Sequence, residues 1–106
     1  HEGLERKGEM MRSRLAELLR EHRLPYQVAG IGSMFQMFFT DRPVRDHRDA
    51  MASDARKFMR LFHALLERGV YIPPSQYETC FLSTAHSDED ISRTVYAYDE
   101  ALEVVR

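Results

Sequence analysis

Near the start of the chain, apolar residues recur at helical spacing and charged residues fill the positions between them. Four apolar residues fall at i, i+4, i+7 and i+8 on one face: Met11, Leu15, Leu18 and Leu19. This pattern predicts a helix from about Leu4 to His22. Pro25 should follow its end, because proline cannot donate to the helical ladder and disfavours helix for the residue before it.

The next segment, residues 26–40, has apolar side chains in both alternating sets of positions. Gly30 and Gly32 bracket Ile31, where a tight turn or bulge is expected, so the segment predicts a β-hairpin or a bent strand pair. One strand face carries Phe35, Met37 and Phe39, and the other carries Met34, Gln36, Phe38 and Thr40. Since both faces include apolar side chains, both should be covered, and the second face indicates a surface for a partner.

A second helical pattern follows the hairpin. Asp46 resembles an N-cap, and an apolar stripe continues to Gly69, a natural stop, with a break expected near Ser53 and Asp54. Val70–Ile72 and Thr79–Thr84 are predicted to be short strands on either side of a rigid loop that contains Pro73 and Pro74.

Ser87 should cap a final helix whose first turn carries three acidic residues, Asp88, Glu89 and Asp90. The order of helix, two strands, helices, two strands and helix predicts an α+β fold. In this fold a small, mostly antiparallel sheet packs against helices, and residues 1–106 form a single domain.

Composition narrows the possible functions. The chain has 106 residues, a formal net charge of −2 and 43% hydrophobic residues, which fits a globular protein and favours neither nucleic acid nor a membrane as partner. The single cysteine, Cys80, excludes an internal disulfide and fits a reducing, cytoplasmic setting. The five histidines do not fall in metal-ligand spacings, so no metal site is expected.

Three residues are candidates for a functional role, but their local sequence does not indicate a particular reaction. Glu78 follows the Pro-Pro loop and precedes a predicted strand, but such a carboxylate is most often a solvated or loop-capping group. Gly32 and Ser33 resemble a turn glycine with a polar neighbour. From the residues alone, none of the three is a functional assignment.

Two longer segments are more specific. Gly32 to Phe39 reads GSMFQMFF, and Gly69 to Glu78 reads GVYIPPSQYE before continuing into FLSTAH at Phe81 to His86. Together they resemble the C-terminal domain of glutamate-1-semialdehyde 2,1-aminomutase, a pyridoxal-phosphate (PLP) enzyme of the class III aminotransferase group. The resemblance covers roughly Leu15 to Leu102 and implies the small C-terminal domain of a fold-type I PLP enzyme.

The resemblance also implies which residues face the active-site cleft: Gly32, Ser33, Ser75, Gln76 and Glu78. Glu78 would orient substrate amino groups or bound water and would not act as a nucleophile. The family's Schiff-base lysine has no counterpart among the two lysines here, Lys7 and Lys57. No catalytic or cofactor-binding residue is therefore expected in this chain.

The implied partner is a large PLP-binding domain of the same polypeptide, in a homodimer that takes a small-molecule substrate. That enzyme, an isomerase, converts glutamate-1-semialdehyde to 5-aminolevulinate in tetrapyrrole biosynthesis. The chain by itself is expected to fold, to be inactive, and to self-associate. Two alternatives stay open: the small domain of a related class III aminotransferase, for example one acting on β-amino acids, and a stand-alone α+β protein-interaction module.

Overall fold

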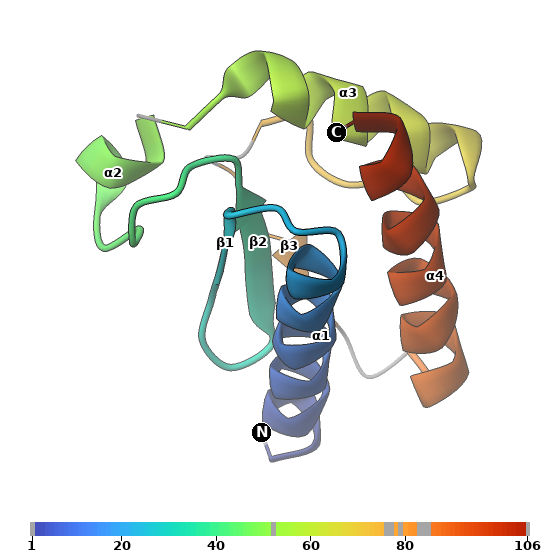
Figure 1. Cartoon of the computed structure of the whole chain (residues 1–106). Helices are drawn as coiled ribbons and strands as arrows, with labels where there is room; N and C mark the ends of the chain where they lie inside the picture. Colours follow the sequence, from blue (N-terminus) through green and yellow to red (C-terminus); the bar gives the residue numbers. More distant parts are fainter. Residues whose placement is uncertain (1, 52, 76–77, 79, 83–85, 106) are drawn as a thin grey trace.

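A computed structural model describes residues 2–51, 53–75, 78, 80–82 and 86–105 (Figure 1). Seven elements follow in order: α1 (Glu2–Glu21), β1 (Gln27–Ala29), β2 (Met34–Phe38), α2 (His47–Met51), α3 (Ala55–Glu67), β3 (Cys80–Phe81) and α4 (Asp88–Val105). This confirms the predicted α+β fold, including the break between α2 and α3. None of the described helices combines the length and the apolar character needed to cross a membrane.

The described strands form one antiparallel sheet in the order β1-β2-β3. In β1 and β2, Val28 pairs with Met37, which confirms the predicted hairpin. On the other edge of β2, Phe35 pairs with Cys80. The predicted strand at Thr79–Thr84 is thus confirmed for Cys80–Phe81, and residues 79, 83 and 84 lie outside the described residues.

The predicted strand at Val70–Ile72 is wrong. Gly69, with a φ of 80°, donates its amide to the Leu66 carbonyl, and Val70 donates to the Leu65 carbonyl. Both bonds cap the C-terminal end of α3. The amide of Val70 therefore bonds to the helix and does not take part in strand pairing. Ile72 is nevertheless buried, which explains the apolar pattern that suggested a strand.

Helix starts follow the predicted capping chemistry. Asp46 accepts the amide of Asp49 at 3.0 Å. Ser87 is the predicted N-cap: its hydroxyl accepts the amide of Asp90, and the Asp90 carboxylate in turn accepts the amide of Ser87, each at 3.0 Å. These bonds from Ser87 lower the pKa of Asp90. Local sequence therefore determines where these helices begin.

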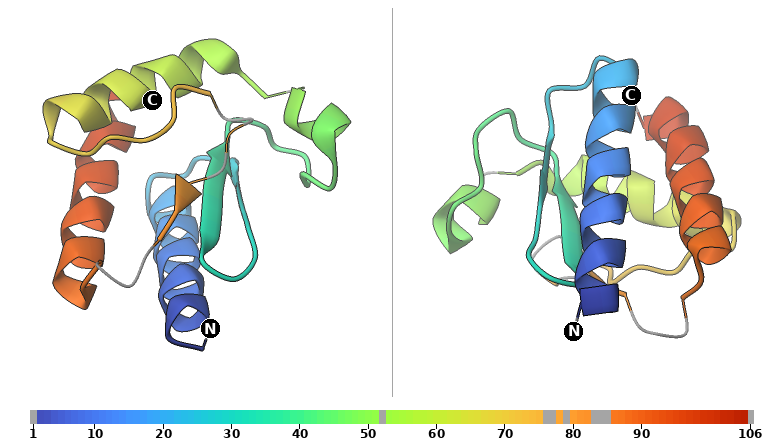
Figure 2. Two further views of the ribbon diagram at one scale, coloured as in Figure 1. Left: turned by 180° about the vertical axis from the view of Figure 1, so that it is seen from behind. Right: turned by 90° about the horizontal axis from the view of Figure 1, so that it is seen from below.

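The core lies between the sheet and the helices. α1 and α4 lie side by side, and α3 crosses α4 near its C-terminal end (Figures 1 and 2). At the end of α1, the ring of His22 contacts Asp99 of α4, with Nε2 at 2.6 Å from Oδ1. The largest fully buried side chains come from α1, β2, α3 and α4: Met11, Leu15, Met37, Phe58, Leu61, Leu65, Ile91, Tyr98, Leu102 and Val105.

Both faces of β2 are covered within the chain itself. Gln36 is 3% and Phe38 is 8% exposed, although the sequence predicted that this face would be left for a partner. That expectation is wrong for β2, because other segments of the chain return to the strand. The Phe39 carbonyl accepts the amide of Asp54, and the Gln36 side chain bonds the backbone of Glu78.

The packing leads to a first prediction. Leu61 is fully buried and Leu66 is 47% exposed on the same helix, α3. We expect Leu61→Ala to lower the free energy of unfolding by about 2–5 kcal/mol, because truncation leaves a cavity. Leu66→Ala should change it by less than about 1 kcal/mol. Urea unfolding followed by circular dichroism measures both values, and equal losses would contradict this description of the core.

Candidate functional site

The two segments singled out in the sequence meet along one edge of β2. The amide of Leu82 donates to the carbonyl of Ser33 at 3.0 Å, and Met34 and Phe35 pair with Phe81 and Cys80. Antiparallel pairing carries the contact onward to Gln36, whose side-chain amide donates to the carbonyl of Glu78. Residues that lie more than 40 positions apart in the chain therefore form a single structural unit.

Gly32 and Ser33 lie in the turn that precedes β2. The amide of Met34 donates to the carbonyl of Ile31 at 3.0 Å, and Gly32 has a φ of 61°. Gly30 has a φ of 148°, and a Cβ there would lie 2.2 Å from the Met34 carbonyl oxygen. Only glycine fits both the backbone angle and the space at position 30. The turn thus holds Ser33, which is half-buried, in one backbone position.

Helix α1 supports this turn through two residues that the sequence did not single out. The Nη1 of Arg12 donates to the carbonyls of Gly32 and Met34, at 2.9 and 2.6 Å. Gly8 packs so closely that a Cβ would lie 1.9 Å from the Gly32 carbonyl oxygen. A glycine inside a helix costs stability, and that was the available signal for a close contact at position 8.

Glu78 lies in a second turn, at the other end of the pairing. Its amide donates to the carbonyl of Ser75 at 3.1 Å, and its side chain is exposed to solvent. The buried Gln36 holds its carbonyl. Ser75 is half-buried in the same turn, and the predicted cleft residue Gln76 lies outside the described residues. The backbone of Glu78 is therefore fixed while its carboxylate faces water.

The predicted cleft residues do not converge on one point. Ser33 sits beside Leu82, whereas Glu78 is held by Gln36, three residues further along β2. At about 3.4 Å per residue in an antiparallel strand, the two turns are roughly 10 Å apart along the sheet. The structure thus presents Gly32 and Ser33 at one end of a sheet edge and Ser75 and Glu78 at the other.

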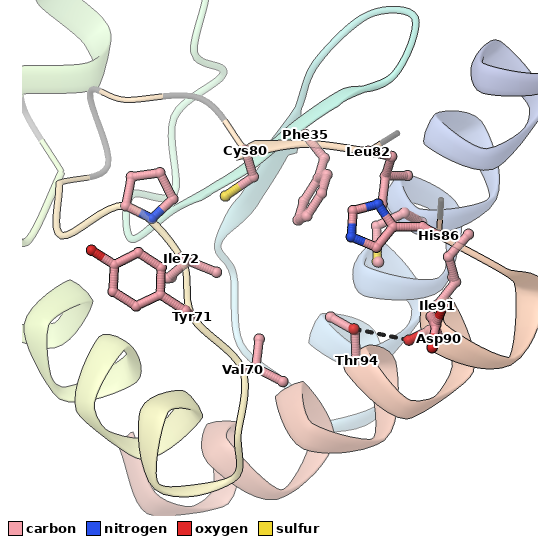
Figure 3. Close-up of a pocket in the computed structure, with 12 residues that line it drawn as sticks. Phe35, Val70, Tyr71, Ile72, Cys80, Leu82, His86, Asp90, Ile91 and Thr94 are labelled. Carbon is pink, nitrogen blue, oxygen red and sulfur yellow. Dashed lines mark hydrogen bonds between the residues drawn. The ribbon is translucent and has the colours of Figure 1, made fainter. Parts of the chain in front are cut away.

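A pocket of about 280 Å³ opens elsewhere, between β2, β3, the segment 70–73 and the start of α4 (Figure 3). Apolar side chains such as Phe35, Ile72 and Ile91 line most of it, with His86 at its mouth. The hydroxyl of Thr94 donates to the Asp90 carbonyl at 2.9 Å. Of the predicted cleft residues that the structure describes, none lines this pocket.

Cys80 also lines this pocket, and its thiol is not activated for reaction. Cys80 is 6% exposed, and burial raises its pKa from 9.0 to about 12. Burial also raises the pKa of Tyr98, which is fully buried. Because only the thiolate is a good nucleophile, the pocket offers no activated thiol near neutral pH. Cys80 is thus a small buried residue of strand β3.

Neither lysine of the chain is placed to hold PLP as a Schiff base. Lys7 donates to the carbonyl of His86, and Lys57 bonds the Tyr26 hydroxyl with its ammonium 5.2 Å from the Tyr26 ring centroid. Both lysines link structural elements, so neither fits the role of a Schiff-base lysine. Among the described residues, no three histidine, cysteine, aspartate or glutamate side chains gather to hold a metal ion.

Comparisons with known proteins confirm the resemblance. The glutamate-1-semialdehyde 2,1-aminomutase of Methanothermobacter thermautotrophicus is 54% identical over 99 residues, which are 93% of this chain and 24% of that protein. The enzyme of the same name from Methanobrevibacter smithii is 47% identical over 104 residues, 98% of this chain and 25% of that protein. The chain therefore spans about a quarter of the length of these curated relatives. No family model matches it.

Solved structures agree with the fold. An omega-transaminase from Sphaerobacter thermophilus superimposes with a TM-score of 0.88 at 32% identity, over 97% of this chain and 24% of that one. A transaminase with PLP bound superimposes with a TM-score of 0.82 at 28% identity, over 99% of this chain and 23% of that one. The fold is thus that of one part of a PLP-dependent transaminase.

The contact between α1 and the Gly32 turn gives a second prediction. Replacing glycine by alanine inside an unobstructed helix stabilises by about 1 kcal/mol. Here the new Cβ would overlap the Gly32 carbonyl, so we expect Gly8→Ala to destabilise by about 1–3 kcal/mol. Ser13→Ala, on an exposed position of α1, should stay within about 0.5 kcal/mol of wild type. Urea unfolding tests both, and a stabilised Gly8→Ala variant would refute the close contact.

The raised thiol pKa gives a third prediction. Above pH 9.0 the unfolded chain loses the Cys80 proton while the folded chain keeps it until pH is about 12. The contribution of Cys80 to the free energy of unfolding should therefore be fully present below pH 9. Above pH 9 it should fall by about 1.4 kcal/mol per pH unit. Tyr98 adds to the fall at higher pH.

Urea unfolding free energies between about pH 8 and pH 10.5 measure this slope. Cys80→Ala should reduce the slope, whatever the variant does to the absolute stability, because the titrating group is gone. An identical slope in both proteins would show that the thiol does not contribute to the alkaline loss.

Proposed function

The chain is homologous to the C-terminal domain of the glutamate-1-semialdehyde 2,1-aminomutases, and on that premise we propose that it is the small domain of such an enzyme. The enzyme would convert glutamate-1-semialdehyde to 5-aminolevulinate, a precursor of tetrapyrroles. The observation that carries the proposal is 54% identity over 93% of the chain to a protein of that name.

The small domain would contribute surface and not the reacting group. When bound to such an enzyme, PLP supplies the electron sink for moving an amino group between carbons. The two lysines of this chain are engaged elsewhere, so we place the cofactor in a large domain of the same polypeptide. We therefore expect the 106-residue chain alone to be inactive and to bind neither PLP nor substrate tightly.

Glu78 is the residue of this chain that we assign to the cleft first. Its carboxylate is exposed, and its backbone is held on both sides, by the Ser75 carbonyl and by Gln36. A carboxylate on a held backbone can attract and orient a substrate ammonium group or a bound water. We assign Ser75, Gln76, Ser33 and Gly32 to the lining of the same cleft.

The partners follow from the same premise. We propose that the sheet edge bearing the Gly32 and Glu78 turns faces the large domain, and that the complete enzyme is a homodimer. The single, buried Cys80 favours the reducing conditions of the cytoplasm as the site of action.

A related activity is the second candidate. The two solved structures described above, at 28% and 32% identity, are transaminases and not aminomutases. A class III aminotransferase would move the amino group to a separate keto acid. The two reactions are told apart by product, because only the aminomutase forms 5-aminolevulinate from glutamate-1-semialdehyde without a second substrate.

The fourth prediction tests the reaction and the role of Glu78 together. The full-length enzyme, supplied with PLP and glutamate-1-semialdehyde, should form 5-aminolevulinate. Glu78→Gln should lower kcat/KM by about 10- to 100-fold, the range expected for a lost hydrogen bond to a charged group. Glu67→Gln, which changes an exposed glutamate at the end of α3, is the matched control and should leave turnover unchanged.

Each outcome decides a separate point. Unchanged turnover in Glu78→Gln would keep the family and refute the cleft role of this carboxylate. Amino transfer to a keto acid, with no 5-aminolevulinate, would favour the aminotransferase.

A further inference from the structure

We propose that Gln36 is a positioning residue that sets the place of Glu78 by extending the β2–β3 pairing through its side chain. The consequence for turnover rests on the proposed function, but the positioning itself does not. Gln36 was not among the residues that the sequence marked for the cleft.

The side-chain amide of Gln36 bridges two backbone groups. Its Oε1 accepts the amide of Met37 at 2.9 Å, and its Nε2 donates to the carbonyl of Glu78. Gln36 is 3% exposed and Met37 is fully buried, so the bond to Met37 lies away from water, and the bond to Glu78 is partly buried. A buried amide that uses both its acceptor and its donor is held in one orientation.

This bridge takes the place of a direct backbone bond between Met37 and Glu78. Among the described residues, the backbone pair next to it on this edge is Phe35 and Cys80. In the same register, Met37 would face Glu78 directly, and its amide would need a carbonyl there. The Gln36 amide instead stands between the two strands, offering one donor and one acceptor as a peptide group does. Glu78 is thereby tied to the sheet while its side chain is free to face outward.

The need to satisfy a buried side-chain amide does not by itself explain why Gln36 bonds both Met37 and Glu78. A polar group that is buried without a partner is costly, so a glutamine at this position must bond something. A merely satisfied amide could bond any nearby group, however, whereas this one spans two segments 42 residues apart. The turn that carries Glu78 is also closed by its own bond to Ser75. Removing the bridge should free that turn from the sheet and leave the rest of the core intact.

Amide hydrogen exchange of the full 106-residue chain, followed by NMR, tests the bridge directly. In Gln36→Met, which keeps length and loses both polar atoms, the amides of Met37 and Glu78 should exchange about tenfold faster. Amides inside α3, such as that of Leu65, should keep their wild-type rates. Gln27→Met, on the neighbouring strand β1, is the matched control and should alter neither Met37 nor Glu78.

Two results would overturn the proposal. Unchanged exchange at Met37 and Glu78 would show that the bridge does not hold the turn. Uniformly faster exchange throughout the chain would reduce Gln36 to a general contribution to stability.

A second variant, Gln36→Glu, gives a reversible test in one protein. When protonated, the new carboxyl can accept the Met37 amide and donate its proton to the Glu78 carbonyl, as the amide does. When ionised, it has no donor and repels that carbonyl, and burial raises the pKa at which this happens. Protection of Glu78 should therefore be native-like at low pH and be lost as pH rises. Gln27→Glu should show no such change, and a pH-independent Gln36→Glu variant would contradict the bridge.

Kinetics of the full-length enzyme then connect the bridge to function. If Gln36 acts through Glu78, Gln36→Met should lower kcat/KM, and adding it to Glu78→Gln should cause no further loss. Additive losses would overturn the positioning role, because Gln36 would then act independently. If Glu78→Gln alone has no effect, the proposed cleft role fails, and the exchange data still decide whether Gln36 positions the turn.

Discussion

The structure depends on β2, a five-residue strand that must satisfy its backbone groups on both edges at once. β1 pairs with one edge, and in the described part of the chain β3 pairs with the other through Cys80 and Phe81. Beyond these pairs, side chains and single backbone bonds complete the edge: Leu82 bonds Ser33 at one end, and Gln36 bonds Glu78 at the other. Since an unpaired buried backbone group is costly, every segment that returns to β2 is placed by that requirement.

Helix α1 holds the turn before β2 in place. Arg12 donates to two carbonyls of that turn, and Gly8 lets the helix approach its backbone directly. Because α1 also packs along α4, the turn is held relative to the whole helical layer. The sheet edge is therefore held at both ends, while the side chain of Glu78 is exposed. In the role that we propose for this chain, such a held edge would present groups to an active site whose reacting group lies elsewhere.

Homology and geometry contribute different parts of the functional conclusion. Identity to the aminomutases assigns the chain to one quarter of a PLP enzyme. The geometry places the two lysines in structural contacts, keeps the Cys80 thiol protonated near neutral pH, and holds the backbone of Glu78 while its carboxylate is exposed. The apolar pocket beside Cys80 lies apart from the predicted cleft residues that the structure describes, so a well-formed apolar pocket does not by itself mark the predicted functional surface.

The sequence by itself determined the elements whose signals are local. Helical spacing predicted α1, capping by Asp46 and Ser87 predicted helix starts, and two glycines predicted the hairpin turn, because each depends on residues within a few positions of one another. Its marker segments also predicted the family. Only the tertiary structure decided that Val70 caps a helix and that the second face of β2 is covered within the chain. It alone also showed that Gln36 reaches Glu78 and that Gly8 touches Gly32. The last two contacts join residues 24 and 42 positions apart, and hydrophobic periodicity carries no information about which distant segments meet.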